Sequence, residues 1–211
     1  MGLLMITDCH LHSFANEAAP KTGAYVPPAR DVHDYMEEAA PLGVRRAVVV
    51  QASVDGTDNS RLVEVLHAKG PVALRGAAMI DADADLPALH DAGIRATRMQ
   101  DRARLGDSAL EHLPALADRA ADVAWHIELN TEPRSFERIA ALVPDLPEGV
   151  RLILDHIGHV DPAAPDPILR LMETGRVWAK LSPMLALCRN ALSTETFNRC
   201  MWDNPARLYG F

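Results

Sequence analysis

The chain has 211 residues, of which 48% are hydrophobic and 24% are charged, a composition typical of a globular protein with one sizeable core. Its 21 basic and 29 acidic residues give a formal net charge of −8, which argues against nucleic acid or an anionic membrane as a partner. The three cysteines include no C-x-x-C spacing, so they predict a reducing compartment, the cytoplasm, rather than a disulfide framework. The start of the chain does not have the pattern of a signal peptide, and we expect no membrane span.

Apolar, strand-like runs alternate with helical patterns along the chain. Most of these runs are continuously apolar, as expected for parallel strands that are covered on both faces. The pattern predicts strands at 3–7, 46–51, 72–80, 94–99, 123–129, 150–157 and 177–181, and helices near 31–42, 58–69, 84–92, 109–121, 134–143 and 166–174. Because no linker or low-complexity segment interrupts this alternation, we predict a single domain over 1–211.

Two architectures are built from repeated strand–helix units, the (β/α)8 barrel and the open doubly wound sheet. The open sheet usually has a glycine-rich phosphate loop after its first strand, whereas this chain has Cys-His-Leu-His-Ser at 9–13. The barrel is therefore favoured. Only seven strands are predicted where a closed barrel needs eight, and barrels typically have about 250 residues. We predict an α/β fold, a (β/α)8 TIM barrel without the segment that carries the eighth strand, with an internal deletion near 183–193.

The end of the first strand carries the motif D-x-H-x-H. Because side chains alternate along a strand, Asp8, His10 and His12 are predicted to share one face. Two imidazoles placed in this way can hold a divalent metal, or can orient water and a polarised carbonyl group.

Polar residues also follow the other predicted strands, and the catalytic groups of a barrel come from the carboxyl ends of several strands. Within a strand, Arg98 needs a counter-charge if it points inward, and a substrate carboxylate would supply one. Asp155 has the opposite parity to its neighbour His156, so we expect it to cap or pair outside the barrel mouth. The polar candidates at strand ends are Gln51, Ser53, Arg98, His126, Glu128, His156 and Lys180.

These motifs together resemble the amidohydrolase superfamily, in particular the amidohydrolase-related branch that includes 2-pyrone-4,6-dicarboxylate lactonase. The resemblance covers nearly the whole chain. It depends on D-x-H-x-H at 8–12, Q-A-S-V-D-G-T-D-N at 51–59, the strand at 93–98, W-H at 125–126, L-D-H-I-G at 154–158, W-A-K-L-S at 178–182 and the tail M-W-D-N-P-A-R-L-Y-G-F at 201–211.

The resemblance implies roles for individual residues. It implies that His10, His12 and His156 are catalytic, and that Arg98 and Arg104 bind a substrate carboxylate. It further implies that the substrate pocket is lined by Tyr25, Gln51, Ser53 and His126.

The activity implied by the resemblance is the hydrolysis of a lactone, or a related cyclic ester or amide, of a small carboxylate-bearing substrate by activated water. Metal content stays open, because His10 and His12 could hold zinc or manganese, or the reaction could proceed without a metal. The alternatives are a metal-dependent decarboxylase of the same superfamily, a phosphoesterase, and an inactive or binding-only remnant. The expected partner is a small-molecule substrate, and a homo-oligomer is a further expectation.

One departure from the family pattern concerns the catalytic base. The eighth strand of the family usually carries W-G-x-D-W-P-H, whose aspartate removes a proton from water, and this sequence has no such motif. Asp203 belongs to the terminal helix and cannot replace that aspartate. The inward-parity carboxylate that could substitute is Glu128.

Overall fold

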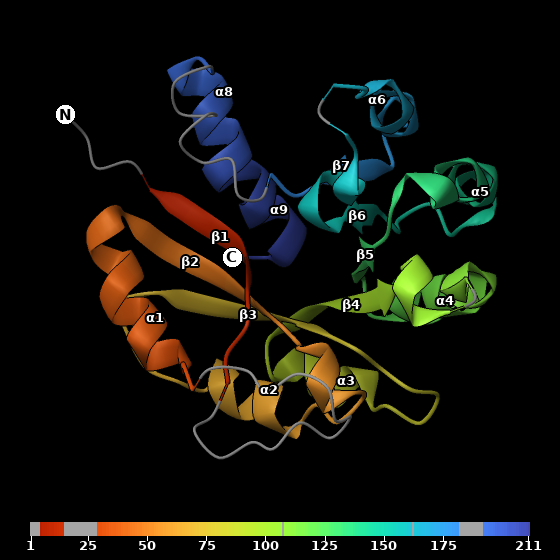
Figure 1. Cartoon of the computed structure of the whole chain (residues 1–211). Helices are drawn as coiled ribbons and strands as arrows, with labels where there is room; N and C mark the ends of the chain where they lie inside the picture. The colour runs from red at the N-terminus through yellow and green to blue at the C-terminus, as the bar shows by residue number, and fades with distance from the viewer. Residues whose placement is uncertain (1–4, 15–28, 107, 162, 182–191) are drawn as a thin grey trace. The chain divides into compact units, whose positions relative to one another are not determined.

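The computed structural model describes residues 5–14, 29–106, 108–161, 163–181 and 192–211, along which strands and helices alternate (Figure 1). The strands are β1 (Ile6–Leu11), β2 (Val44–Val50), β3 (Ala73–Ala78), β4 (Ile94–Gln100), β5 (His126–Asn130), β6 (Leu152–Leu154) and β7 (Val177–Ala179). The helices are α1 (Val32–Ala39), α2 (Ser60–Leu66), α3 (Leu86–Asp91), α4 (Leu113–Asp122), α5 (Phe136–Leu142), α6 (Asp166–Met172), α8 (Thr194–Asn198) and α9 (Asn204–Tyr209), with a π-helical turn, η8 (Arg199–Asp203), between the last two. None of these helices combines the length and apolar character needed to cross a bilayer, in the part of the chain that the structure describes.

All seven predicted strands and all six predicted helices are present. The largest differences are at strand boundaries. The sixth strand, predicted over 150–157, is limited to Leu152–Leu154 because a turn begins at Asp155. The fifth begins at His126 rather than at 123, because α4 extends to Asp122 and Ala124 has a positive φ of 54°.

The chain divides into two compact units. Unit 1 comprises Met1–Arg95 and Ala186–Phe211, and unit 2 comprises Ala96–Leu185. The predicted α/β fold with parallel strands is confirmed within each unit, whereas one domain over 1–211 and a (β/α)8 barrel without its eighth strand stay predictions.

In unit 1, β1, β2 and β3 are hydrogen-bonded in parallel, in that order. The central strand, β2, is the most deeply buried, with Ala47 and Val48 fully inaccessible, as its continuous apolar sequence predicts. The preceding helix α1 begins with a capping box, in which the Asp31 side chain accepts from the backbone N–H of Asp34 and the Asp34 side chain accepts from that of Asp31.

The C-terminal helices of unit 1 are fixed to its sheet by cation–π stacking. The turn η8 and helix α9 contact β1 (Figure 1). The Arg46 guanidinium of β2 lies 3.6 Å from the centroid of the Trp202 ring and 5.4 Å from that of Phe211. Arg75 of β3 donates from Nη2 to the Gly210 carbonyl at 2.9 Å. The tail motif thus supplies the aromatic rings that cover two arginines of the sheet.

Replacing Arg46 with methionine is expected to lower the free energy of unfolding by about 1–2 kcal/mol, because the variant loses a partly desolvated cation–π contact. Urea titration of Arg46→Met, Trp202→Leu and the double variant measures the coupling between the two side chains. Arg199→Met, at an exposed position on the same C-terminal segment, is the control and should change stability little. Additive effects of Arg46→Met and Trp202→Leu would show that the stacking contributes nothing.

In unit 2, β4, β5, β6 and β7 are also parallel and hydrogen-bonded in sequence order. The register aligns Arg98 with Glu128, Glu128 with Ile153, and Ile153 with Trp178. These four residues share one face of the sheet. Asp155 and Lys180 each follow two positions after Ile153 and Trp178, directly beyond the ends of β6 and β7, and strand alternation returns them to that same face.

Candidate active site

The two histidines of the first strand lie together in unit 1. The ring centroids of His10 and His12 are 5.1 Å apart in an edge-to-face arrangement. His12 Nδ1 lies 2.7 Å from the Val50 carbonyl oxygen at the end of β2. Because a carbonyl oxygen only accepts hydrogen bonds, Nδ1 carries a proton, and in the neutral ring Nε2 then carries the lone pair. This neutral tautomer suits His12 to accept a proton or to coordinate a cation through Nε2.

The strict alternation predicted for the first strand is wrong. Asp8 pairs with Ala47 and Leu11 with Val49, so three steps along β1 match two along β2, which is a β-bulge. The Asp8 carboxylate accepts from the Tyr35 hydroxyl of α1 at 3.0 Å and from the backbone N–H of His10 at 3.0 Å. Asp8 therefore bonds helix α1 and its own strand. Burial, together with the Asp8 charge, raises the pKa of Tyr35, so the hydroxyl keeps the proton it donates.

The side chain of Gln51 organises the loop that follows β2. Its amide nitrogen donates to the carbonyl oxygens of Gly56 at 2.9 Å and Asp58 at 3.0 Å. Its amide oxygen accepts from Asn59 Nδ2 at 2.7 Å and from the Met79 backbone N–H at 2.8 Å. The protein's own groups thus bond both ends of this buried amide. A substrate contact by Gln51 stays a prediction.

Ser53 and Tyr25 are two further residues that were predicted to line the pocket. Ser53 is exposed at the start of a 3₁₀ turn over Ser53–Asp55. Tyr25 lies outside the described residues.

Five charged or titratable side chains form a buried cluster in unit 2. Lys180 Nζ lies 2.6 Å from Glu128 Oε2 and 3.2 Å from Asp155 Oδ1. Arg98 Nε donates to the other oxygen of Asp155 at 3.1 Å, and His126 Nε2 lies 3.6 Å from Glu128 Oε1. Two cations therefore face two carboxylates, and each of these charged side chains is at most 4% exposed. We call this group the unit 2 charge cluster.

Two expectations about this cluster need correction. The counter-charge of Arg98 was expected from a substrate, but Asp155 supplies it. Asp155 was placed outside the barrel mouth, but it is fully buried, because it lies two residues beyond Ile153 and so shares the face of Glu128. His156 follows the end of the strand, so strand parity does not set its direction.

Glu128 is a poor candidate for the missing catalytic base. Burial alone would raise its pKa, but the Lys180 ammonium and the nearby His126 ring lower the pKa of Glu128 to about 2. A carboxylate with this pKa has little tendency to take a proton from water. Burial also lowers the pKa of His126, so this imidazole is neutral near pH 7.

These two pKa shifts predict a loss of stability in acid. A lowered pKa in the folded state means that the unfolded chain binds protons first. Folding is therefore destabilised as the pH falls below about 6.5, the ordinary value for His126. A second loss occurs as the pH falls from 4.5, the ordinary value for Glu128, towards 2. Urea titrations at intervals between pH 8 and pH 3 measure both losses, and a free energy of unfolding that stays constant from pH 7 to pH 4 would contradict the expectation.

His156 lies in a left-handed turn after β6. His156, Ile157, Gly158 and His159 all have φ between 52° and 60°, a region that non-glycine residues rarely occupy. The rings of His156 and His159 have centroids 5.3 Å apart. His159 Nε2 lies 3.2 Å from Asn130 Oδ1 at the end of β5. Burial and the charge of Arg102 lower the pKa of His159.

Arg104, a predicted carboxylate ligand, is exposed in a 3₁₀ turn over Ala103–Leu105 after β4. Its neighbour Arg102 pairs with Glu132 at 3.2 Å. Substrate binding by Arg104 stays a prediction.

Asp101 is a buried polar residue that sequence reasoning missed. Its carboxylate accepts from the hydroxyls of Ser108 at 2.8 Å, Thr131 at 3.1 Å and Ser135. Burial acts to raise the pKa of Asp101, but these hydrogen bonds outweigh it and hold the pKa below its usual range. Ser135, whose position predicts a helix cap, gives its hydroxyl to Asp101 instead of to α5. The only sequence signal was an aspartate directly after an apolar strand.

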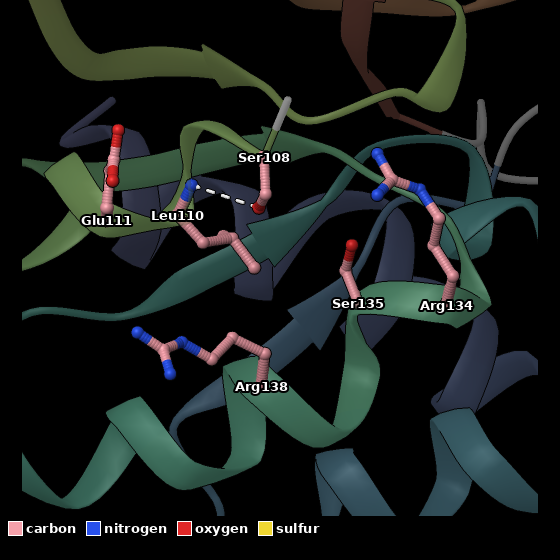
Figure 2. A pocket seen from close by; sticks show the side chains of 6 residues that line it. All are labelled: Ser108, Leu110, Glu111, Arg134, Ser135 and Arg138. Atoms are coloured by element: carbon pink, nitrogen blue, oxygen red, sulfur yellow. Dashed lines mark hydrogen bonds between the residues drawn. The ribbon is translucent and has the colours of Figure 1, made fainter. Parts of the chain in front are cut away.

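A pocket of about 340 Å³ is lined in part by Ser108 and Ser135, two of the residues that donate to Asp101 (Figure 2). Ser108 lines it from one loop, where its oxygen accepts from the Leu110 N–H, and Arg138 lines it from helix α5. None of the predicted site residues lines this pocket. Its full lining is Ser108, Leu110, Glu111, Arg134, Ser135 and Arg138.

Metal binding by either unit alone depends on the donor groups that the unit brings together. Neither unit, taken by itself, contains among its described residues three histidine, cysteine or carboxylate groups grouped closely enough to share an ion. A catalytic zinc site uses three protein ligands. In unit 2, Lys180 and Arg98 lie against the oxygens of Glu128 and Asp155, which opposes a further cation there. A metal held by His10 and His12 therefore stays a prediction.

Comparison with known proteins identifies relatives that act on lactones. The chain is 36% identical over 124 residues, 57% of its length, to the 2-pyrone-4,6-dicarboxylate hydrolase of Comamonas testosteroni. It is 28% identical over 189 residues to the 4-sulfomuconolactone hydrolase of Rhizobium radiobacter and 25% identical over 204 residues to that of Hydrogenophaga intermedia, which is 83% and 89% of the chain. The aligned part spans 40%, 62% and 66% of these relatives, respectively.

Solved structures share the fold. The chain superposes over 98% of its length on a protein from Acinetobacter baumannii described as a probable 2-pyrone-4,6-dicarboxylic acid hydrolase with citric acid bound, with a TM-score of 0.71 and 17% identity, covering 99% of that chain. A structure from Agrobacterium tumefaciens gives a TM-score of 0.78 at 18% identity, with coverage of 98% and 96% of the two chains. The family model for amidohydrolases matches residues 7–187. The chain belongs to the amidohydrolase family.

Proposed function

We propose that this chain acts as a hydrolase that opens a small lactone carrying a carboxylate or a similar anionic group, by attack of water on the ring ester. The observation that carries the proposal is the similarity to curated hydrolases of 2-pyrone-4,6-dicarboxylate and 4-sulfomuconolactone. The family match over residues 7–187 supports the reaction class. The substrate itself is proposed only as a class.

The proposed roles of the histidines follow from their chemistry. His10, His12 and His156 are proposed as catalytic residues, and His156 is proposed to polarise the lactone carbonyl, which increases its reactivity towards water. The hydrogen bond from His12 to the Val50 carbonyl fixes the tautomer of that ring and supports a role for His12 as a proton acceptor. Arg104 is the exposed arginine proposed to bind an anionic substituent, whereas Arg98 is already paired with Asp155.

The proton of the attacking water needs an acceptor. Glu128 is not proposed for this role, because its pKa is lowered to about 2 and Lys180 lies 2.6 Å from its carboxylate. His12, with its lone pair on Nε2, is the base that we propose. The acceptor role therefore does not require a carboxylate from unit 2.

A panel of lactones tests the proposal. We expect the purified chain to hydrolyse 2-pyrone-4,6-dicarboxylate or 4-sulfomuconolactone at a saturable rate, and to turn over an uncharged six-membered lactone much more slowly. Ring opening is followed by the loss of pyrone absorbance and by the acid released at constant pH. A folded protein that opens none of these lactones, while binding them, would support the binding-only alternative instead.

Metal dependence separates hydrolysis from the decarboxylase alternative. Metal analysis of the purified protein, followed by assay after dialysis against a chelator, measures both content and requirement. Lactone opening that survives chelation would support hydrolysis by the chain's own side chains. Release of carbon dioxide that depends on added zinc or manganese would favour the decarboxylase. A cytoplasmic location and self-association stay predictions.

A further inference from the structure

The turn that carries His156 is strained, and one side of it is fixed by buried charge. Left-handed backbone is unfavourable for each residue that has a Cβ atom, and Ile157, which is β-branched, has a φ of 55°. Such a turn persists only where surrounding contacts hold it, and residues of this kind cluster at functional sites. The contacts that hold this turn can be identified.

The buried charges lie at the start of the turn. Asp155, the residue directly before His156, has its two carboxylate oxygens 3.1 Å from Arg98 Nε and 3.2 Å from Lys180 Nζ. The Lys180 backbone carbonyl also accepts from the Ile157 N–H at 3.1 Å, which joins β7 to the middle of the turn. Lys180 therefore holds the turn through both its side chain and its backbone.

Two further contacts limit the rest of the turn. The backbone of Gly158 lies against the Phe136 ring, where an added Cβ would come within 2.6 Å of a ring carbon. His159 bonds Asn130 at 3.2 Å. The carboxylate of Asp155 is the contact closest in sequence to His156, so it has the most direct control over the backbone at that residue.

We propose that Asp155 is a positioning residue, whose carboxylate, held between Arg98 and Lys180, keeps the left-handed turn in the conformation that directs the His156 imidazole. This role deepens the proposed lactone hydrolysis and rests on it for its functional meaning. In this role Asp155 acts through the backbone of His156 rather than by contact with the substrate. Removing its charge changes the conformational freedom of His156.

The test uses the Asp155→Asn variant, which keeps the shape of the side chain but removes its charge. Histidine ring resonances of 15N-labelled protein report the environment of His156, whose signals are assigned with a His156→Gln variant. We expect the His156 signals to shift or broaden in Asp155→Asn, while those of His33 and His112 on exposed helical segments stay in place. Asp145→Asn removes an exposed carboxylate of the same unit and is the matched control.

A second variant separates positioning from folding. Asp155→Asn leaves two buried cations facing only Glu128, and this imbalance alone could unfold unit 2. The double variant Asp155→Asn/Lys180→Met leaves Arg98 and Glu128, which are register partners on neighbouring strands and balance each other in charge. We expect the double variant to be more stable than Asp155→Asn while its His156 signals remain displaced.

Lactone kinetics complete the test. A misplaced catalytic group costs up to about a hundredfold in rate, so we expect kcat to fall by about that factor in the folded variants while KM changes little. His156 signals that stay unchanged in both variants would overturn the proposal. Absence of lactone turnover in the wild-type protein would overturn the proposed function alone, because the histidine resonances still decide the positioning role.

Discussion

Replacing Lys180 with methionine is expected to lower the free energy of unfolding by about 3–5 kcal/mol, the range for breaking a buried ion pair by removing one partner. The ammonium lies between two carboxylates that no solvent reaches, Glu128 at 2.6 Å and Asp155 at 3.2 Å. Without it, Arg98 is left to compensate both negative charges. The variant also keeps a side chain of similar length, so the loss reports charge rather than a cavity.

Urea titration monitored by circular dichroism measures this change. Lys69→Met, at an exposed position in unit 1, is the matched control and should differ from the wild type by less than about 0.5 kcal/mol. The deficit of Lys180→Met should shrink below pH 4, because protonation of a carboxylate then compensates for the missing cation. A Lys180→Met protein as stable as the control at pH 7 would show that the unit 2 charge cluster contributes nothing to folding.

Replacing His156 with glutamine is expected to lower kcat/KM for lactone opening by about 10²–10³, the range for removing one group that stabilises the developing negative charge on a carbonyl oxygen. The proposed function places this imidazole at the reacting carbonyl. Because His156 lies in a turn rather than in the core, the substitution should leave the fold and its stability close to the wild type.

Parallel variants show whether the effect is specific. His112→Gln changes an exposed histidine of the same unit and should leave kcat/KM unaltered. His159→Gln removes the bond to Asn130 and should have an effect between those of the other two variants. Equal rates for His156→Gln and His112→Gln would remove His156 from the proposed mechanism.

The strands could be predicted well because parallel strands covered on both faces consist of continuous apolar runs, such as the run within Arg46–Gln51. Prediction failed where the outcome depends on one local backbone event. β1 has a bulge between Asp8 and Leu11, and no residue type in D-x-H-x-H signals that bulge. The same is true of the left-handed turn, which includes Ile157, a residue that disfavours this conformation.

The buried charges were identified one by one but could not be paired from the sequence. Arg98 lies on β4, Glu128 lies on β5 and Lys180 directly follows β7, so their contacts depend on the strand register. A shift of one residue would turn each side chain to the opposite face. The position of Asp155 was predicted wrongly because the sixth strand was expected to run to 157. Asp155 was then assigned the face opposite to that of His156. In the structure β6 ends at Leu154, so strand alternation does not apply to His156.

The central claim is that the chain adds water to a lactone carbonyl, and hydrolysis in water enriched in 18O tests it most directly. The purified protein is incubated with 2-pyrone-4,6-dicarboxylate or 4-sulfomuconolactone, and the product is analysed by mass spectrometry. The account predicts a ring-opened acid that retains every carbon of the substrate and carries one 18O atom in its new carboxylate. A product that has lost carbon dioxide, or a lactone that remains intact in the presence of the folded protein, would contradict it.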